Sequence, residues 1–385
     1  MRYYILLFVS LLSYTLSTQT TLPETVVDNI EKRIEYGHSP SIVVGIIDAK
    51  GPKYYTFGKT TLDGQKVDEH TIYEIGSISK TFTAILLAQL VKEGKVKLDD
   101  PVQKYLPEEV KMPTWKDQAI TLGHLSDHTS SLPRLPDNLS PSDQSNPYAD
   151  YTVEQLYEFL SDYELPREIG SVYEYSNLAQ GLLGHVLGLI AGESYEDLVK
   201  KRIAKPLGMK ATTIALSDKQ KARLAPGHNG AQVVSNWDLP TLAGAGAIRS
   251  SLHDMLNFMA ANLGKKKNGL YAAMQLSHQA RHDMAGTNRV GLGWHIGNGA
   301  EGDFVWHNGG TGGYRTFSGF SPKTGRGVVV LTNSTQGADD IGFHLLDSNA
   351  PLQEVKPSAT NAIKTAITEN GPKRAKPPTI EGSSA

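Results

Sequence analysis

The chain has 385 residues, of which 39% are hydrophobic and 20% are charged, enough for one large or two medium-sized hydrophobic cores. A formal net charge of −2 with mixed signs provides no basic surface, which excludes nucleic acid as a partner. The chain has no cysteine, so a disulfide framework, a thiolate nucleophile and a cysteine-based zinc site are excluded as well. Any catalysis must use oxygen or nitrogen nucleophiles, and we expect no cofactor.

Residues 1–17 have the pattern of a signal peptide. Arg2 supplies the positive charge, Tyr3 to Leu16 form an apolar run, and the small residues Thr15 and Ser17 suit cleavage after residue 17. A membrane anchor is the alternative, but polar residues interrupt the run and it is shorter than the span of about 20 residues that a membrane requires. We therefore expect export to the periplasm or the extracellular space, with no membrane association beyond this segment.

The next part of the chain predicts an α/β (α+β) fold. Helical spacing over residues 24–36 precedes two apolar runs, 41–48 and 53–60, joined by a turn. Strands joined by so short a turn pair in an antiparallel manner. Four more strand-like runs lie between residues 291 and 333. We therefore expect an antiparallel sheet flanked by helices.

Between the two groups of strands the pattern changes. Pro-, Asp- and Ser-rich loops follow residue 98, and helical spacing then returns up to about residue 203. This pattern predicts a mostly helical subdomain, residues 98–243, inserted into a sheet subdomain made of residues 24–97 and 244–350. Residues 351–385 are rich in Pro, Lys, Thr and Ser, which predicts a disordered tail.

A serine and a lysine three residues apart, Ser77 and Lys80, open an apolar run that predicts one buried helix over residues 77–94. Positions i and i+3 share a helix face, so the Lys80 amine should lie over the Ser77 hydroxyl group, at the helix end that favours negative charge. Such a serine can lose its proton and act as a nucleophile. The alternative is a helix-capping serine beside a solvated lysine, because the motif is short.

A second pattern, Tyr175-Ser176-Asn177, immediately precedes an apolar helical run. Polar side chains at this position can contribute to a catalytic site. The alternative is that Ser176 or Asn177 caps the following helix.

A third pattern, His307-Asn308-Gly309-Gly310, follows a predicted strand, and its glycines allow another backbone or a ligand to approach closely. A glycine-rich hairpin is the alternative interpretation. A phosphate-binding loop is excluded, because no Gly-Lys-Ser/Thr follows the glycines.

Taken together and in this order, the three patterns resemble the S-x-x-K, Y-x-N and K-T-G motifs of the serine β-lactamase and penicillin-binding protein superfamily. The chain looks most like the class C branch, which also contains D-Ala-D-Ala carboxypeptidases and endopeptidases, D-aminopeptidases and family VIII esterases. The resemblance covers residues 24–347 and includes the segments YEIGSISKTFTA, ITLGHLSDHTSSLP, YEYSNLAQGLLGHVL and WHNGGTGGY. It implies the β-lactamase/transpeptidase-like fold.

The resemblance also implies residue roles. Ser77 would be the acylated nucleophile, Lys80 its proton-transfer partner, Tyr175 the general base and Asn177 an anchor for the substrate amide. To accept a proton at neutral pH, a tyrosine of ordinary pKa about 10 would need a pKa lower by roughly 2 to 3 units, and a Lys80 ammonium could supply much of that shift.

The third motif departs from the family pattern, because it reads H-N-G where many β-lactamases have K-T-G. We expect His307, Gly309 and Gly310 to contact substrate, with the backbone N–H groups of Ser77 and Gly310 forming an oxyanion hole. An imidazole of pKa near 6.5 would replace a permanent cation, so a substrate carboxylate would lose a charge-assisted hydrogen bond. Strong β-lactamase activity is therefore not expected.

Two histidine pairs have i, i+4 spacing, His124 with His128 and His278 with His282. In the zinc metalloprotease motif, glutamate follows the first histidine, whereas residue 125 is leucine here. We expect no metal site.

Three functions remain open. The first is a serine hydrolase that acts on D-amino-acid peptides, such as those of peptidoglycan, or on β-lactams. The second is a carboxylesterase that uses the same residues on small esters. The third is a non-catalytic, penicillin-recognising sensor or scaffold, which the presence of all four motif side chains argues against. In each case the expected partner is a small molecule or a peptide.

Overall fold

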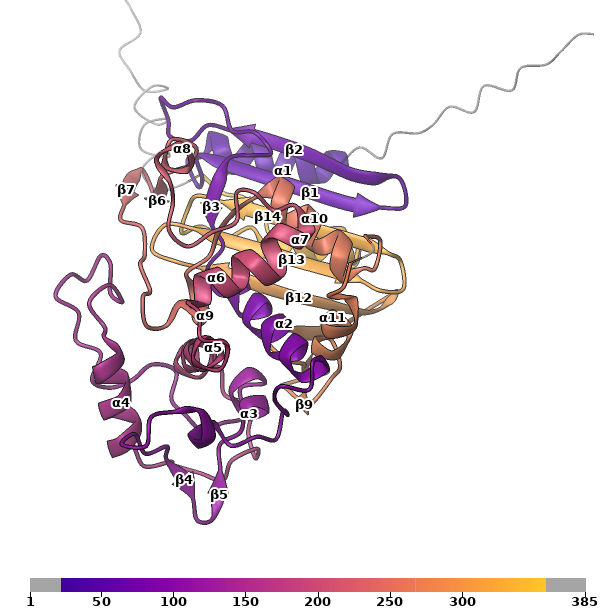
Figure 1. Ribbon diagram of the computed structural model, residues 1–385. Helices are drawn as coiled ribbons and strands as arrows, with labels where there is room; N and C mark the ends of the chain where they lie inside the picture. Colours follow the sequence, from indigo (N-terminus) through magenta and orange to yellow (C-terminus); the bar gives the residue numbers. More distant parts are fainter. Residues whose placement is uncertain (1–21, 267, 358–385) are drawn as a thin grey trace, which may run out of the picture.

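The computed structural model describes residues 22–266 and 268–357, and within them eight strands form one antiparallel sheet. The strand order is β2-β1-β14-β13-β12-β11-β10-β9, so the first and last strands of the chain lie side by side in the sheet (Figure 1). The predicted antiparallel sheet flanked by helices is confirmed. The strands are β1 (Ser41–Asp48), β2 (Gly51–Gly58), β9 (His282–Asp283), β10 (Arg289–Val290), β11 (His295–Gly299), β12 (Gly302–Gly310), β13 (Arg315–Ser321) and β14 (Arg326–Thr332).

Helices cover both faces of this sheet, which explains why the β1 sequence is almost continuously apolar. Successive side chains of a strand point to opposite faces. Ile42, Val44 and Ile46 pack in the core beneath α1 (Glu24–Glu35) and α12 (Asp339–Leu346). Val43 and Ile47 pack in the larger core on the other face, which includes residues of α2 (Ser79–Lys92) and α10 (Leu252–Asn262).

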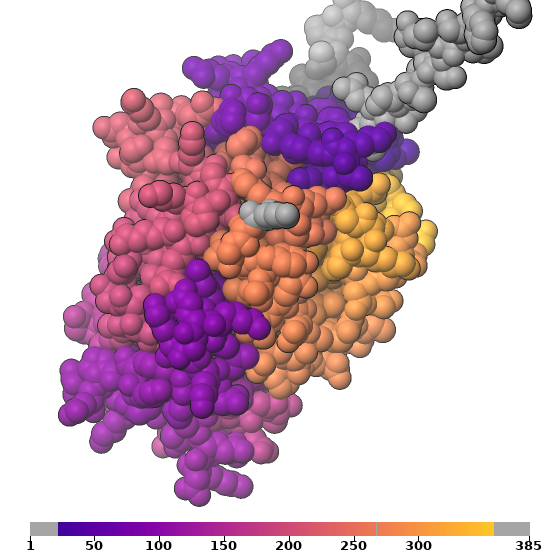
Figure 2. Space-filling view, turned by 45° about the vertical axis from the view of Figure 1, so that its right-hand side comes forward, coloured from indigo at the N-terminus to yellow at the C-terminus, as the bar shows by residue number. Residues whose placement is uncertain are grey.

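Residues between the two halves of the sheet form a mostly helical region, part of which lies below the sheet in Figure 1. Its helices are α3 (Leu122–Ser126), α4 (Val153–Asp162), α5 (Asn177–Ala191), α6 (Tyr195–Val199), α7 (Lys205–Leu207) and α8 (Asp218–Lys221). Short strand pairs accompany them: β4 (Thr114–Trp115) with β5 (Gln118–Ala119), and β6 (Gly227–Asn229) with β7 (Gln232–Val234). The chain then returns through α9 (Ala243–Gly246), β8 (Arg249–Ser251), which pairs with β3 (Ile72–Glu74), α10 and α11 (Tyr271–Ser277). In the space-filling view, the purple and pink residues of the helical region cover the left of the molecule, beside the orange residues that follow them in the chain (Figure 2).

The ends of the chain differ in what can be described. The predicted signal peptide, residues 1–17, lies outside the described residues, as do residues 358–385 of the predicted tail. Residues 351–357, which also fall within the predicted disordered tail, instead pack beside α1 and α12: the carbonyl oxygen of Gln353 accepts a hydrogen bond from Asn29 Nδ2, and its N–H donates to Asp340. No helix within the described residues is long and apolar enough to cross a membrane.

Candidate active site

Ser77 lies on a short 3-10 turn, η1 (Gly76–Ile78), that leads directly into α2. The predicted single helix over residues 77–94 is therefore divided, with Ser77 on the tighter turn and Lys80 in the first turn of the α-helix. The expected contact forms nonetheless, because Lys80 Nζ lies 3.0 Å from Ser77 Oγ. The alternative of a solvated lysine is wrong, since Lys80 is completely buried.

The Lys80 amine contacts two further oxygen atoms. Its Nζ donates to the Asn177 side-chain oxygen at 2.8 Å and to the carbonyl oxygen of Ala245 at 2.7 Å. Asn177 starts α5, and Ala245 lies in α9, so three segments that are distant in sequence meet at this nitrogen. None of the three motifs includes Ala245, and its contact with Lys80 was not predicted, because a backbone carbonyl leaves no signature in side-chain chemistry.

Burial affects the pKa of Lys80 strongly. Desolvation lowers it well below the ordinary value, and the positive charge of Arg134 acts in the same direction. Within the described residues, no carboxylate forms an ion pair with this amine. Burial therefore shifts Lys80 toward its neutral, amine form.

Tyr175 packs against the same amine, with Lys80 Nζ 4.8 Å from the centre of its ring. Its hydroxyl group is near enough to the Ser77 side chain for Ser77 to influence its pKa. Burial raises the pKa of Tyr175 to about 12, and Ser77 and the charge of Arg134 offset only part of this rise. The expectation that a Lys80 ammonium lowers this pKa is wrong, because both groups are desolvated and Tyr175 remains a neutral phenol.

The helix-capping alternative for the second motif applies to Ser176. Its side chain accepts a hydrogen bond from the Ala179 N–H at 2.9 Å, which caps α5. Its hydroxyl group also donates to the carbonyl oxygen of Pro133 at 2.6 Å. The cap thereby positions the residues on either side of it, and both Tyr175 and Asn177 face Lys80.

The third motif ends strand β12, which is hydrogen bonded to β13 and lies against the start of η1. A Cβ atom on Gly309 would lie 2.0 Å from the carbonyl oxygen of Ile75, and one on Gly76 would lie 2.7 Å from the Gly310 backbone nitrogen. Gly76 also has a φ of +51°, in the left-handed region that favours glycine. These glycines bring the backbone of Gly310 beside that of Ser77, as the predicted oxyanion hole requires.

His307 differs from the prediction in its protonation. The side chain is buried, and its pKa lies well below the ordinary value because of desolvation and the nearby His295 and Lys80. His307 Nδ1 lies 2.5 Å from the carbonyl oxygen of Asn308, so this nitrogen carries the proton and Nε2 is an acceptor. The predicted pKa near 6.5 is therefore wrong, and His307 presents no cation to a substrate.

Two further histidines, which the motifs did not indicate, surround Tyr175 and His307. The His295 ring stacks on His307 with centres 4.8 Å apart, and burial lowers the pKa of His295 to about 4. The His128 ring stacks on Tyr175 at 4.7 Å, and its Nδ1 accepts the N–H of Ser176. Within the described part of the chain, no cluster of three or more His, Asp or Glu side chains is arranged to hold a metal ion.

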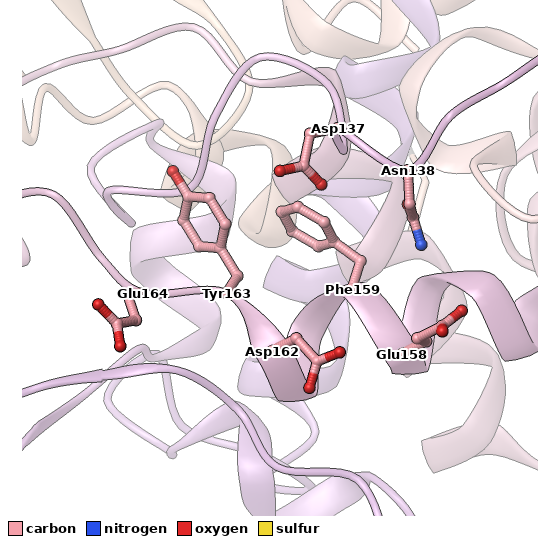
Figure 3. A pocket seen from close by; sticks show the side chains of 7 residues that line it. All are labelled: Asp137, Asn138, Glu158, Phe159, Asp162, Tyr163 and Glu164. Carbon is pink, nitrogen blue, oxygen red and sulfur yellow. The ribbon is translucent and has the colours of Figure 1, made fainter.

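A separate cavity of about 380 Å³ lies beside α4, and none of the candidate site residues lines it. Figure 3 shows four carboxylates around the rings of Phe159 and Tyr163, one of them, Asp137, from the loop before α4. The lining of this cavity contains no serine and no lysine, so it holds no counterpart of the pair formed by Ser77 and Lys80.

Comparison with known proteins agrees with this geometry. The Beta-lactamase family model matches residues 26–346. The D-alanyl-D-alanine-carboxypeptidase/endopeptidase AmpH of Escherichia coli K12 is 30% identical over 87% of this chain and 92% of its own length. A beta-lactamase of the same organism is 27% identical over 83% of this chain and 90% of its own length.

Solved structures show the same fold. A class C β-lactamase superposes with a TM-score of 0.75 at 23% identity, over 86% of this chain and 96% of the other. The class C β-lactamase of Rhodobacter sphaeroides gives a TM-score of 0.71 at 24% identity, over 81% and 94%. This chain therefore belongs to the β-lactamase family, within the superfamily of serine hydrolases that also contains the penicillin-binding proteins.

Proposed function

We propose that this protein forms an acyl-enzyme on Ser77 and hydrolyses D-amino-acid peptides of the peptidoglycan type, with β-lactams as acylating ligands or slow substrates. The names of its relatives, a D-alanyl-D-alanine-carboxypeptidase/endopeptidase and β-lactamases, support this substrate class. The reaction is hydrolysis through an acyl-enzyme, and it requires no cofactor.

One observation carries the proposal: the buried Lys80 amine lies within hydrogen-bond distance of three oxygen atoms. The carbonyl oxygen of Ala245 and the side-chain oxygen of Asn177 can only accept, so they take two N–H donors. A neutral amine then keeps its lone pair for the third oxygen, the hydroxyl group of Ser77. This arrangement suits a general base for Ser77.

The proposed acylation step uses these groups in order. Ser77 Oγ forms a bond to the substrate carbonyl carbon while its proton passes to Lys80, and the oxyanion is held by the N–H groups of Ser77 and Gly310. Tyr175, a phenol, then donates its proton to the departing amine as the C–N bond breaks, and it regains a proton from the Lys80 ammonium. Tyr175 thus acts as the acid in acylation, in place of the general base that the family resemblance implied.

Deacylation follows the reverse proton path. As water attacks the acyl carbonyl carbon, its proton passes to Tyr175 while Tyr175 gives its own proton to the restored Lys80 amine. The Lys80 ammonium then returns a proton to Ser77 Oγ as the bond from Oγ to the acyl carbon breaks. Asn177 Nδ2 remains available to a substrate carbonyl oxygen, because Oδ1 of the same side chain is bonded to Lys80.

A carboxylesterase is the second candidate, and the buried, neutral His307 favours it. An ester needs the nucleophile and the oxyanion hole but no cation for a carboxylate. Parallel assays of a D-alanyl-D-alanine peptide and a p-nitrophenyl ester of a short acid would separate the two candidates, since the one with the higher kcat/KM identifies the main activity.

Labelling tests the nucleophile directly. Wild-type protein incubated with benzylpenicillin or a fluorophosphonate should gain one adduct by intact-protein mass spectrometry, and Ser77→Ala should gain none while its thermal midpoint stays nearly unchanged. Ser171→Ala serves as the matched control, because Ser171 is exposed on a surface loop. An adduct that persists in Ser77→Ala would refute the assignment.

Export is part of the proposal, because peptidoglycan lies outside the cytoplasm. The charged start and apolar run of residues 1–17 support it. N-terminal sequencing of protein recovered from the periplasm or the culture medium would test it, with Thr18 expected as the first residue.

A further inference from the structure

A cation lies at the candidate active site, in which His307 is neutral. Arg134 belongs to the loop after α3, and its guanidinium carbon lies 5.0 Å from the centre of the Tyr175 ring. The Arg134 side chain is exposed, whereas Lys80 and His307 are buried. Arg134 therefore presents a positive charge to solvent at the entrance to the site.

No acidic side chain within the described residues forms an ion pair with Arg134. The other arginines beside the helical region do form such pairs, for example Arg167 with Glu174 and Arg281 with Asp127. Asp137, three residues further along the chain, instead lines the separate cavity beside α4 (Figure 3). A guanidinium left without a carboxylate partner keeps its five N–H donors for an anion from solution.

The backbone of Arg134 is held firmly against the second motif. Its carbonyl oxygen accepts hydrogen bonds from the N–H groups of Asn177, at 3.0 Å, and Leu178, at 3.2 Å. The preceding carbonyl, of Pro133, accepts the Ser176 hydroxyl group. The side chain therefore starts from a fixed point beside Asn177 and Tyr175, which reduces the entropy lost when it binds a ligand.

An aromatic wall continues from Arg134 toward the third motif. Tyr148 is near enough to Arg134 and Asn177 for both to influence its pKa, and its ring contacts the Trp237 ring at 5.3 Å between ring centres. Trp237 in turn reaches the loop after β12, since a Cβ atom on Gly312 would lie 2.7 Å from its Nε1. Tyr148 is buried and Trp237 is half-buried, so two aromatic rings adjoin the cation along one side of the site.

We propose that Arg134 binds a free carboxylate of the substrate, while Tyr148 and Trp237 pack against the adjoining apolar part. Arg134 would be a specificity-determining residue that supplies the cation which His307 does not. The inference rests on the proposed acyl-enzyme function of Ser77, and it specifies which acyl compounds react fastest. A guanidinium can pair with a carboxylate through two parallel hydrogen bonds.

Two matched pairs of esters provide the test. In the first pair, the acyl part is N-succinyl-D-alanine or its N-succinamoyl analogue, both as p-nitrophenyl esters. In the second pair, N-acetyl-D-alanine is esterified to 3-hydroxybenzoate or to 3-hydroxybenzamide. Each pair differs only in a carboxylate against a carboxamide, on the acyl side or on the leaving group.

In wild-type protein, kcat/KM for the carboxylate should exceed that for the carboxamide in at least one pair. Arg134→Met should lower that ratio about tenfold to a hundredfold, the range expected for one charge-assisted pair, and Arg134→Lys should restore part of it. The ratio should also fall as salt rises in wild type but not in Arg134→Met. The ester pair whose ratio falls in Arg134→Met shows whether Arg134 binds a carboxylate on the acyl side or on the leaving group.

Arg289→Met is the control for net charge, because its guanidinium is already bonded to Asp303 on the neighbouring part of the sheet, and it should leave both ratios unchanged. Equal losses on carboxylate and carboxamide in Arg134→Met would mean that Arg134 only adjusts the charge around Tyr175, and would overturn the proposal. A wild-type ratio near one in both pairs would overturn it too. Failure of the Ser77 function looks different, since no ester would then leave an acyl adduct on Ser77.

Discussion

Replacing Lys80 with methionine should change how the stability of the protein depends on pH. Folding buries Lys80 as a neutral amine, because desolvation holds its pKa well below the ordinary value of about 10.4. In the unfolded chain the same lysine is solvated and protonated. The wild-type protein therefore releases one proton from Lys80 on folding at any pH between the two pKa values, and Lys80→Met releases none.

The magnitude follows from proton linkage. If the unfolded state binds one proton more than the folded state, the free energy of unfolding rises by about 1.4 kcal/mol for each unit that the pH rises. As pH rises toward the ordinary pKa of lysine, the free energy of unfolding of the wild type should therefore increase relative to that of Lys80→Met, by up to about 1.4 kcal/mol per pH unit. Contributions from all other titrating groups cancel in this difference.

Urea unfolding of both proteins at three pH values, followed by far-UV circular dichroism, gives the required free energies, provided that the m-values agree. Lys97→Met is the matched control, because Lys97 is exposed and its removal should give no such slope. If the difference in free energy of unfolding between the wild type and Lys80→Met does not change with pH, Lys80 is an ammonium in the folded protein. That result would refute the mechanism in which Lys80 acts as a neutral amine.

Tyr175→Phe should lower kcat/KM about a hundredfold or more without lowering the thermal midpoint, because it removes the proton donor but keeps the buried ring; near-normal turnover would contradict the acid role. The ratio of kcat/KM for a penicillin to that for a p-nitrophenyl ester should stay within about twofold between pH 7.5 and pH 6, because burial keeps His307 neutral. A several-fold rise of this ratio at pH 6 would instead indicate that His307 has a pKa near 6.5. Gly76→Ala should slow acylation by penicillin at least about tenfold, because its Cβ would lie 2.7 Å from the Gly310 nitrogen. Gly230→Ala is its control, with a similar φ of +60° but nothing within 4 Å, and equal effects of the two variants would exclude a role for the Gly76 contact.

Part of this site follows from local sequence alone. The i, i+3 spacing places Lys80 Nζ at 3.0 Å from Ser77 Oγ, because both residues follow one helical path whatever packs around them. The antiparallel sheet was likewise predictable, since short turns between apolar runs allow only that pairing for adjacent strands. The family resemblance rested on the same local patterns.

Tertiary structure decided the protonation states. The pKa values of Lys80, Tyr175 and His307 depend on how completely distant segments exclude water from them, and burial reversed the direction expected for Tyr175 and shifted His307 well below its ordinary range. The packing of α9 places the carbonyl oxygen of Ala245 beside Lys80, and the packing of the loop after α3 places the guanidinium of Arg134 beside Tyr175. Sequence spacing predicts which groups of one segment meet, whereas desolvation and contacts between segments are properties of the folded chain.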